Sequence, residues 1–600
     1  MATLALKDNR VLKLIKLSKK AYADFKWQIV LLTFFGFVGG VLEGIGINAL
    51  VPLFSFSLGL GEGQDDIISK TIKNIFEFFG INFSVKYLLV LIIILFILKA
   101  LVTVFLEYLR LYITSDYEVR TRSRLFEKII KANWPYHIKQ RAGNLETILL
   151  IDVPASGGLL SQISSTIIIC TSLIVYVFVA VNISLVITLI TLVVGAIMFL
   201  VLKPLIYKTK IFAGQRVNLN KDIAHHIGEN IQGIKTVKSM VASTAVWSKG
   251  VLLFEELKRL TIKLGILKSF NASLIQPVGV IFVSLLFAFT YQSETFNLAM
   301  LIAIVYLIQQ IFVYVQQLQR TLQSMNEFLP HLNTVIQYQD LADKNIEADQ
   351  GSKNFSFESE LVFSQVGFSY NKEKQILKNV NLNIKKGEML GLIGPSGVGK
   401  TTLVDLVLRL LPLQQGAITI DGGSINDIKL DEWRKNIGYV SQDIFLVNAT
   451  IADNIRFYDN QVTQDQIISA AKMANIYDFI DGLPEKFNTM VGDRGLMLSA
   501  GQRQRLVIAR ILARNPQILI LDEATSALDN ESEAQIQSVI RNLKGKITVL
   551  AIAHRLSTIM DSDRLVVLDA GNIVEEGVPG DLLKQKDSYL FKVYNIRNNN

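Results

Sequence analysis

Long apolar runs are the feature that most constrains how this chain can fold. Six stretches are mostly apolar and reach the length of about 20 residues that a helix needs to cross a bilayer. Because 50% of the 600 residues are hydrophobic and the apolar ones gather in the first half, we expect a membrane domain there. The predicted spans are residues 28–58, 86–112, 158–181, 183–206, 270–291 and 295–317.

The connections between these spans predict the topology. Spans three and four are joined by only "VNIS", and spans five and six by only "YQSETF", which indicates tight hairpins on one side of the membrane. Two longer connections are rich in Lys and Arg and therefore favour the cytoplasmic side. Their helical patterns continue from the spans, so we expect long helices that project into the cytoplasm, in a multi-pass protein of the cytoplasmic membrane.

Charge and cysteine content exclude other classes. The net charge is +9, but the basic residues cluster beside apolar segments as membrane topology requires, so nucleic-acid binding is not expected. The single cysteine, Cys170, excludes a disulfide framework. Residues 1–27 form a basic amphipathic segment that either lies on the cytoplasmic membrane surface or is a solvated tail. Residues 59–85 predict a short helix on the outer surface.

The second half of the chain has a different pattern. Residues 318–355 read as a polar linker that contains Pro330, and residues 356–595 read as a soluble α/β domain. Apolar strand runs alternate with helical patterns, which indicates a mainly parallel sheet with ligands at the strand ends. The predicted fold is a six-helix, all-α membrane domain over residues 28–317, with long cytoplasmic helix extensions, followed by an α/β P-loop domain.

A glycine-rich loop carries the clearest chemistry. "GPSGVGKT" at 394–401 fits the P-loop pattern and stands between a strand run and a helical run, as that motif requires. Its glycines let backbone N–H groups point at phosphates, Lys400 reaches the β- and γ-phosphates, and Thr401 offers a hydroxyl to Mg²⁺. The predicted ATP-binding residues here are Gly394, Pro395, Ser396, Gly397, Val398, Gly399, Lys400, Thr401 and Thr402.

Acidic residues follow a later strand. "ILILDE" places Asp522 and Glu523 at the end of an apolar run, where Asp522 can hold Mg²⁺ through water and Glu523 can face the attacking water. His554 ends another apolar run and is a candidate contact of the γ-phosphate. We therefore predict Glu523 and His554 as catalytic residues, with ATP and Mg²⁺ as the cofactors.

With these motifs in order, the sequence resembles the ATP-binding cassette transporters of the exporter type. Tyr370 in "VGFSY" resembles the aromatic residue that stacks on adenine, and Gln442 in "YVSQD" resembles the glutamine that meets Mg²⁺. "LSAGQ" resembles the family signature, and "SALD" resembles the loop that crosses between subunits. The resemblance adds Tyr370, Gln442, Ser499, Gly501, Gln502 and Asp529 to the predicted ATP contacts.

The resemblance also implies an assembly. In this family two cassettes pack head to tail, so that the signature loop of one, here with Ser499 and Gly501, covers ATP held by the P-loop of the other. The chain carries one cassette and one membrane domain, so it is expected to dimerise, as a homodimer or with a related chain. Ala500 departs from the usual glycine and puts the turnover rate in question.

The substrate is less constrained. The first span is similar to that of bacterial flippases of lipid-linked oligosaccharides, which implies an amphipathic, lipid-linked substrate and contact with membrane lipid. Lipid A-type and multidrug exporters are the alternatives, and a peptide exporter or a nucleic-acid-processing ATPase is less favoured. The clearest charges inside the first two spans are Glu43 and Lys99, which lie at similar depths when counted at about 1.5 Å per residue. They predict either a structural ion pair or a polar part of the substrate cavity.

Overall fold

The computed structural model describes most of the chain, in two compact units. The units are Met1–Ala132 with Tyr136–Ile346, and Asn133–Pro135 with Glu347–Asn600. The described residues are 22–49, 84–140, 142–290, 298–371, 374–522, 529–552 and 559–592, together with residues 53, 74, 76, 77 and 80. The predicted amphipathic segment before residue 22 and most of the predicted outer helix lie outside them, as do Glu523 and His554.

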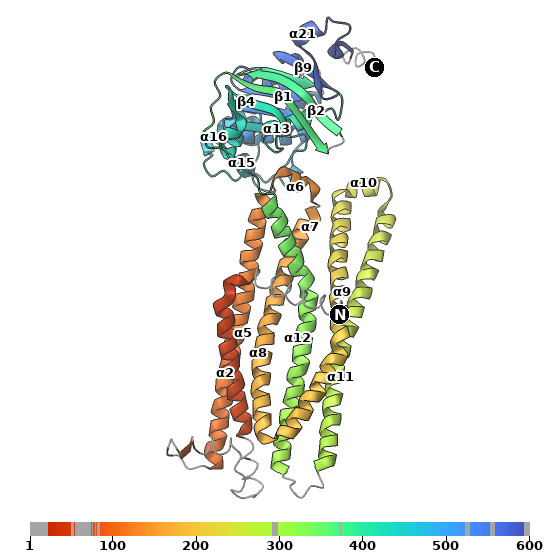
Figure 1. Ribbon diagram of the computed structural model, residues 1–600. Helices are drawn as coiled ribbons and strands as arrows, with labels where there is room; N and C mark the ends of the chain where they lie inside the picture. The colour runs from red at the N-terminus through yellow and green to blue at the C-terminus, as the bar shows by residue number, and fades with distance from the viewer. Residues whose placement is uncertain are drawn as a thin grey trace. The chain divides into compact units, whose positions relative to one another are not determined.

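Long helices build the first unit (Figure 1). The helices α5, α9, α11 and α12 contain 46–48 residues each, which is about 70 Å at 1.5 Å per residue and more than twice the thickness of the bilayer core. The predicted extension of the membrane helices into water is confirmed. The helices of this unit are η1 Ala23–Phe25, α2 Lys26–Asn48, α5 Val85–Ile130, α7 Ala142–Thr147, the π-helical turn η2 Ile148–Asp152, α8 Val153–Ile183, α9 Leu185–Gln232, α10 Ile234–Ser239, α11 Ser243–Thr290 and α12 Leu298–Lys344, together with all but the first two residues of α6 Trp134–Lys139.

The apolar content of these helices agrees with the predicted spans. Within the described residues, four helical segments are long and apolar enough to cross a membrane: Ala23–Ile47, Val85–Ile130, Asn144–Asn182 and Leu185–Gln232. They contain or overlap the first four predicted spans. The fifth and sixth predicted spans lie largely within α11 and α12, where the described part supplies the shorter apolar stretch Pro277–Ala288.

The segment predicted as a polar linker continues α12. Residues 318–344 remain helical although Pro330 removes one backbone hydrogen bond. Tertiary contacts support the helix on both sides of the proline, because Leu329 and Leu332 are buried in the core of the unit. The ring nitrogen Nδ1 of His331 also lies 2.6 Å from a carboxylate oxygen of Asp152 on η2. The polar composition therefore reflects a helix that has left the bilayer rather than an irregular connection.

A glycine stripe on α2 sets the packing of α2 against α8. A Cβ on Gly40 would lie 3.3 Å from Val175, and a Cβ on Gly44 only 2.9 Å from the same side chain. Gly36, one turn earlier, faces Thr171 at 3.1 Å. Small residues at a spacing of four let two membrane helices approach closely. This close approach brings Glu43, next to Gly44, within reach of α8 and α12.

Two sheets form the second unit. The order β2-β1-β4-β5 is antiparallel, and in the order β10-β9-β3-β8-β7-β6 all strands but β10 are parallel to their neighbours, as predicted. Strands β3, β7 and β8 are buried along their whole length, which explains their continuous apolar sequence. The strands are β1 Glu360–Asn371, β2 Lys374–Lys385, β3 Met389–Ile393, β4 Gln415–Ile420, β5 Gly423–Ser424, β6 Ile437–Val440, β7 Ile518–Asp522, β8 Thr548–Ile552, β9 Arg564–Asp569 and β10 Asn572–Gly577.

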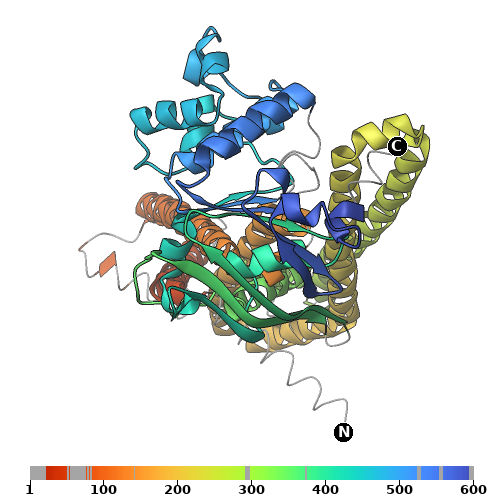
Figure 2. The ribbon, with the colours of Figure 1, turned by 90° about the horizontal axis from the view of Figure 1, so that it is seen from above.

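Helices flank this parallel sheet (Figure 2). The helices between residues 451 and 512, light blue in Figure 2, gather away from the green antiparallel strands β1 and β2. The helices are α13 Lys400–Val407, η3 Ile425–Asp427, α14 Leu430–Lys435, α15 Ile451–Arg456, α16 Gln464–Met473, α17 Tyr477–Asp481, η4 Lys486–Asn488, η5 Asp493–Gly495, α18 Ala500–Leu512, α19 Asn530–Leu543 and α21 Pro579–Leu582.

Candidate ATP site and membrane polar cluster

The loop between β3 and α13 has the backbone shape that its glycines predict. Gly397 and Gly399 adopt φ angles of +77° and +111°, which residues with a Cβ rarely enter. A Cβ on Gly394 would lie 2.0 Å from the carbonyl oxygen of Leu568, so no larger residue fits there. The loop leads directly into α13, whose first N–H groups have no partner within the helix and attract phosphate oxygens.

Lys400 occupies the first position of α13 and is only 6% exposed. Its Nζ donates to the carbonyl oxygens of Gly394 and Pro395, at 2.9 and 3.0 Å. The loop therefore folds around the ammonium group, which is where a lysine must stand to reach nucleotide phosphates. The backbone and the lysine together fit the phosphate chain of ATP.

Neighbouring strands bring the predicted Mg²⁺ ligands to the same edge of the sheet. Asp522 ends β7 and is 5% exposed, and Gln442 follows β6, which runs parallel to β7. Strand β8 is parallel to both β7 and β3, so the strand that precedes the P-loop ends at this edge too. The hydroxyl of Thr401, the carboxylate of Asp522 and the amide of Gln442 supply the oxygen donors that Mg²⁺ prefers. The residues present fit this ion.

Tyr370, at the end of β1, packs beside the start of α13. Its hydroxyl is 3.3 Å from Oγ1 of Thr402 on α13, and its ring packs edge-on against Phe368 with centroids 5.1 Å apart. The side chain is 53% exposed, which leaves ring surface for a flat ligand. Glu523 and His554 fall outside the described residues, so their catalytic roles stay predictions.

The signature loop begins a helix through a reciprocal cap. The Ser499 hydroxyl accepts a hydrogen bond from the Gln502 N–H at 3.2 Å, and the Ser499 N–H donates to the Gln502 side chain at 2.8 Å. This capping box fixes the first turn of α18, whose N-terminus then carries unpaired N–H groups and a partial positive charge. The exposed Ser499 is thus held in a geometry suited to an anion.

Packing explains the glycine and the alanine of this loop. A Cβ on Gly501 would lie 2.3 Å from Oγ of Ser532 on α19, so the approach of α19 requires glycine here. Asp529 caps α19, and its hydrogen bonds to the side chain and the N–H of Ser532 lower the pKa of its carboxyl group. Ala500 lies within the helix and packs against the core, so its methyl group causes no backbone strain.

Two residues near the Mg²⁺ edge were missed by the sequence analysis. Burial and the nearby Asp522 carboxylate raise the pKa of Asp405 on α13 to about 6. The Tyr439 hydroxyl lies 3.4 Å from Oδ2 of Asp522, and burial together with that carboxylate raises its pKa. Asp405 stands one turn after Thr401 and interrupts the apolar run 403–407 of α13, a position that could have revealed it.

Glu43 and Lys99 meet inside the membrane unit, as their predicted depths indicated. They form an ion pair between α2 and α5, with side chains 10% and 28% exposed. The second carboxylate oxygen of Glu43 accepts a hydrogen bond of 3.1 Å from the Tyr314 hydroxyl on α12. The ring of Tyr314 lies 5.2 Å from that of Tyr176 on α8. Neither tyrosine could be predicted from the sequence, because only tertiary packing joins these four helices.

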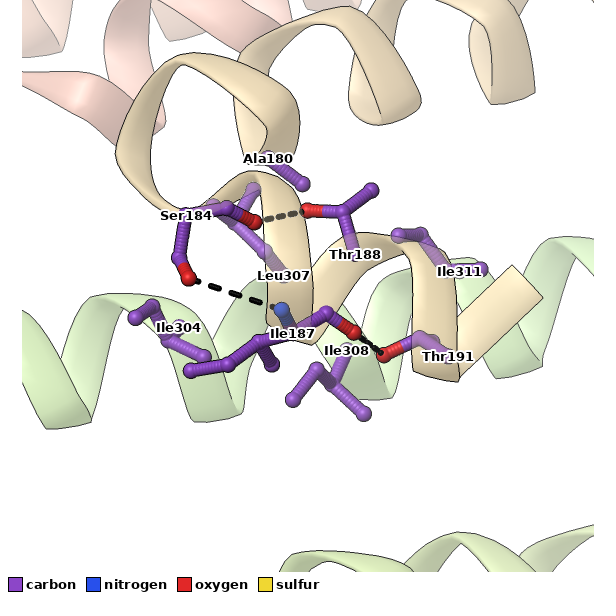
Figure 3. Close-up of a pocket in the computed structure, with 9 residues that line it drawn as sticks. All are labelled: Ala180, Ser184, Ile187, Thr188, Thr191, Ile304, Leu307, Ile308 and Ile311. Atoms are coloured by element: carbon purple, nitrogen blue, oxygen red, sulfur yellow. Dashed lines mark hydrogen bonds between the residues drawn. The ribbon is translucent and has the colours of Figure 1, made fainter. Parts of the chain in front are cut away.

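A small pocket between the α8–α9 hairpin and α12 carries no comparable chemistry (Figure 3). The Thr188 hydroxyl donates to the carbonyl of Ser184, and the Thr191 hydroxyl donates to that of Ile187. These hydroxyl groups are therefore bonded to their own helix, and the threonines add methyl groups to the isoleucines around them. The pocket is an apolar packing space.

Comparison with known proteins identifies the family. Residues 377–526 match the family model described as ABC transporter, and residues 29–318 match the ABC transporter transmembrane region. An ATP-dependent lipid A-core flippase of Bordetella avium is 31% identical over 512 residues, which are 84% of this chain and 86% of that protein. The chain belongs to the ABC transporter family. The transporter's cassette indicates ATP hydrolysis coupled to transport, and its apolar helices make it a multi-pass membrane protein, both as predicted.

Two further proteins extend the comparison. An ATP-dependent lipid A-core flippase of Desulfotalea psychrophila is 47% identical over 241 residues, which are 40% of the transporter but only 42% of that relative's length. A solved structure described as a bacterial Atm1-family ABC exporter with ATP bound matches with a TM-score of 0.79 and 25% identity, over 96% of the transporter and 99% of that chain. The predicted exporter fold is confirmed by this match.

Proposed function

We propose that the transporter uses ATP to move a glycolipid across the cytoplasmic membrane by alternating access. One observation carries the proposal: a P-loop folded around the buried Lys400 stands in the same chain as membrane-crossing helices. The substrate class is supported by the similarity to a lipid A-core flippase over 84% of the chain. Lipid A-type glycolipids and lipid-linked oligosaccharides both join sugars to an apolar lipid. The relatives favour the former, and the first span favours the latter.

Two chains are needed for a complete ATP site under this proposal. Lys400, Thr401 and Asp522 of one chain bind the phosphates and their metal ion. Ser499 and the N-terminus of α18 in a second, identical chain cover the γ-phosphate. The capped start of α18 supports this role, because unpaired N–H groups there favour an anion. The match to a bacterial exporter chain over 99% of its length and 96% of this chain is consistent with one cassette per chain.

Hydrolysis then follows from positioning and charge. Lys400 and the loop N–H groups hold the phosphates and stabilise the charge that develops on them. Mg²⁺, when bound, neutralises charge on the phosphate oxygens. Glu523 orients the attacking water, and His554 contacts the γ-phosphate. Tyr370 stacks on the adenine base, which keeps the phosphates next to these groups.

Mixed dimers test the shared site. A dimer that pairs a Lys400→Ala chain with a Ser499→Arg chain should keep one sound composite site, because both defects fall in the other site. It should therefore bind ATP in the closed form, whereas either homodimer should not. Closed homodimers with bound ATP, and mixed dimers without it, would contradict the shared site.

A flipping assay tests the substrate class. The full-length protein, reconstituted in liposomes, is given a lipid A-type glycolipid, a lipid-linked oligosaccharide, a sugar-free phospholipid and an amphipathic drug. We expect ATP-dependent movement and ATPase stimulation with the glycosylated lipids. Transport of the drug alone would favour a multidrug exporter and overturn the glycolipid assignment.

A further inference from the structure

A group of polar and aromatic side chains surrounds the Glu43–Lys99 pair. A structural ion pair does not by itself require these neighbours. On α12, Tyr306, Gln310 and Tyr314 are spaced four residues apart and so share one helix face. The Gln310 side chain donates to the Tyr306 hydroxyl at 2.8 Å. We name these residues the tyrosine cluster: Glu43, Lys99, Tyr176, Tyr306, Gln310 and Tyr314.

The charges in the tyrosine cluster cancel. Lys99 contacts one carboxylate oxygen of Glu43, and the Tyr314 hydroxyl donates to the other. A phosphate group would need a cation that is not already paired, and a cationic drug would need a carboxylate that is not already paired. The cluster therefore favours a ligand part that is polar and uncharged.

One hydroxyl of the cluster has no partner at full hydrogen-bond geometry. Tyr176 is fully buried, and within the described residues no acceptor or donor meets that geometry at its hydroxyl, although the Glu43 carboxylate lies close enough to interact with it. A buried polar group without a well-aligned partner lowers the stability of the folded state, so its presence calls for a compensating role. Tyr306, Gln310 and Tyr314 are half-buried. Tyr306 and Tyr314 lie close enough to Tyr176 to interact with it, and Gln310 bonds to Tyr306. The cluster thus combines aromatic faces with hydrogen-bonding groups that are not all used.

We propose that the tyrosine cluster is a sugar-binding subsite on the transport pathway, and this proposal rests on the glycolipid function above. A sugar has apolar C–H faces that pack on aromatic rings and hydroxyl groups that donate and accept. It would supply a well-aligned partner for Tyr176 and bond to the half-buried Tyr306, Gln310 and Tyr314. The neutral Glu43–Lys99 pair fixes Tyr314 for this contact. The lipid phosphates bind elsewhere, because the cluster has no unpaired cation.

Hydroxyl deletions in the full-length transporter test the subsite. The probes are a polyprenyl diphosphate that carries a disaccharide and the same diphosphate without sugar, each measured by ATPase stimulation in liposomes. Tyr306→Phe and Tyr314→Phe should raise the half-saturating concentration of the glycosylated probe about tenfold, the value of one lost hydrogen bond. The response to the sugar-free probe should not change. Tyr112→Phe, at a 50% exposed tyrosine on α5, is the matched control and should change neither response.

Tyr176→Phe separates a binding role from a structural one. Since the hydroxyl is buried without a well-aligned partner, its removal should raise the melting temperature of the ligand-free protein and still weaken the response to the glycosylated probe. Equal shifts for both probes, unchanged responses in all three variants, or a lower melting temperature of Tyr176→Phe would overturn the subsite. If the wild type moves glycolipids but the variants respond normally, only the subsite fails. If the wild type responds to no glycosylated lipid, the proposed function fails and the subsite with it.

Discussion

Lys400 in the cassette and Lys99 in the membrane unit are both lysines withdrawn from water, but they are held in different ways. Lys400 donates to carbonyl groups five and six residues away in its own loop. Lys99 contacts a carboxylate on another helix, which in turn accepts from a tyrosine 271 residues further along the chain. The first arrangement is set by a short motif, whereas the second depends on the packing of three helices, α2, α5 and α12.

This difference has a functional consequence. Neutral carbonyl oxygens hold the ammonium group of Lys400 in place without a formal charge of their own, which suits a group that must meet phosphates. The carboxylate of Glu43 cancels the charge of Lys99, which suits an uncharged partner or a permanent structural pair. The cassette should therefore tolerate changes far from its loop, and the membrane cluster should respond to changes on any of its helices.

The largest effect is expected at the cassette lysine. Lys400→Ala should lower ATPase activity by about 1000-fold, because it removes the cation that the loop is folded around. Measurement of ATP hydrolysis and of nucleotide binding in detergent checks this, with Lys378→Ala on β2 as a control for loss of a lysine. Activity within tenfold of the wild type would show that the local motif is not the phosphate site.

A change at Glu523 tests its predicted catalytic role in the cassette. Glu523→Gln keeps the shape of the side chain but cannot act as a base, so turnover should fall by about 100-fold or more. ATP binding should persist, and the ATP-bound dimer should accumulate. Equilibrium binding and size-exclusion chromatography with ATP measure both effects. Near-normal hydrolysis in this variant would refute the role of Glu523.

Removing one member of the membrane pair tests its dependence on a distant partner. Lys99→Met leaves the buried Glu43 without its cation and should destabilise the protein by about 2–3 kcal/mol, less than a fully buried pair because Lys99 is 28% exposed. The double variant Glu43→Gln with Lys99→Met should recover most of this loss. Thermal unfolding of the full-length protein compares the three. Equal stability of the single variant and the wild type would contradict a buried pair.

The charge swap separates structure from transport at the same pair. Glu43→Lys with Lys99→Glu preserves the ion pair but moves the acceptor of the Tyr314 hydrogen bond to another helix. Restored stability together with restored transport would indicate a purely structural pair. Restored stability without transport is expected if the pair positions Tyr314 for the substrate.

A pH effect is expected at Asp405. Its folded pKa of about 6 lies above the ordinary value of about 3.9, so the folded state binds this proton more tightly. Protonation of Asp405 therefore stabilises the folded state. This contribution to the free energy of unfolding is complete below about pH 4 and is lost as the pH rises through 6. Asp405→Asn should therefore stabilise the nucleotide-free protein at pH 7.5 by about 1–2 kcal/mol, a figure reduced for solvent screening.

Asp421 provides a control of opposite sign for that measurement. Although burial works to raise its pKa, hydrogen bonds from the N–H groups of Glu358, Ser359 and Glu360 lower it overall. Its stabilisation is present above the ordinary pKa and is lost as the pH falls through the lowered value. Melting temperatures from pH 3 to 8 should shift in opposite directions for Asp405→Asn and Asp421→Asn. Parallel pH profiles would show that neither carboxyl titrates as described.

The smallest effect is expected in the signature loop. Ala500 is helical and packs on the core, so Ala500→Gly should destabilise the protein by about 1 kcal/mol or less and change ATPase activity by less than about twofold. Steady-state kinetics and thermal unfolding measure both. A large gain in turnover would mean that the methyl group obstructs the nucleotide.

The candidate ATP site could be predicted where its parts are local. Each part is a short stretch of sequence: the P-loop, the strand before it, and the acidic end of β7. The strands β3 and β7 are fully buried, so both can be recognised in the sequence as apolar runs. Gly501 is different, because the sequence indicated a phosphate contact while the structure also shows the close approach of Ser532. Asp405 was missed because its environment comes from Asp522, more than a hundred residues away.

The sequence by itself determined the membrane-crossing runs, the long helices beyond them, and the nucleotide loop with its strand-end partners. These depend on periodicity and spacing, which helix rise and strand alternation convert directly into geometry. Only the tertiary structure decided that α12 continues past Pro330, and that Tyr176 and Tyr314 gather around the Glu43–Lys99 pair. The physical reason is that these buried polar groups bond to groups on other helices. The number of residues between two helices does not determine which of their faces pack together.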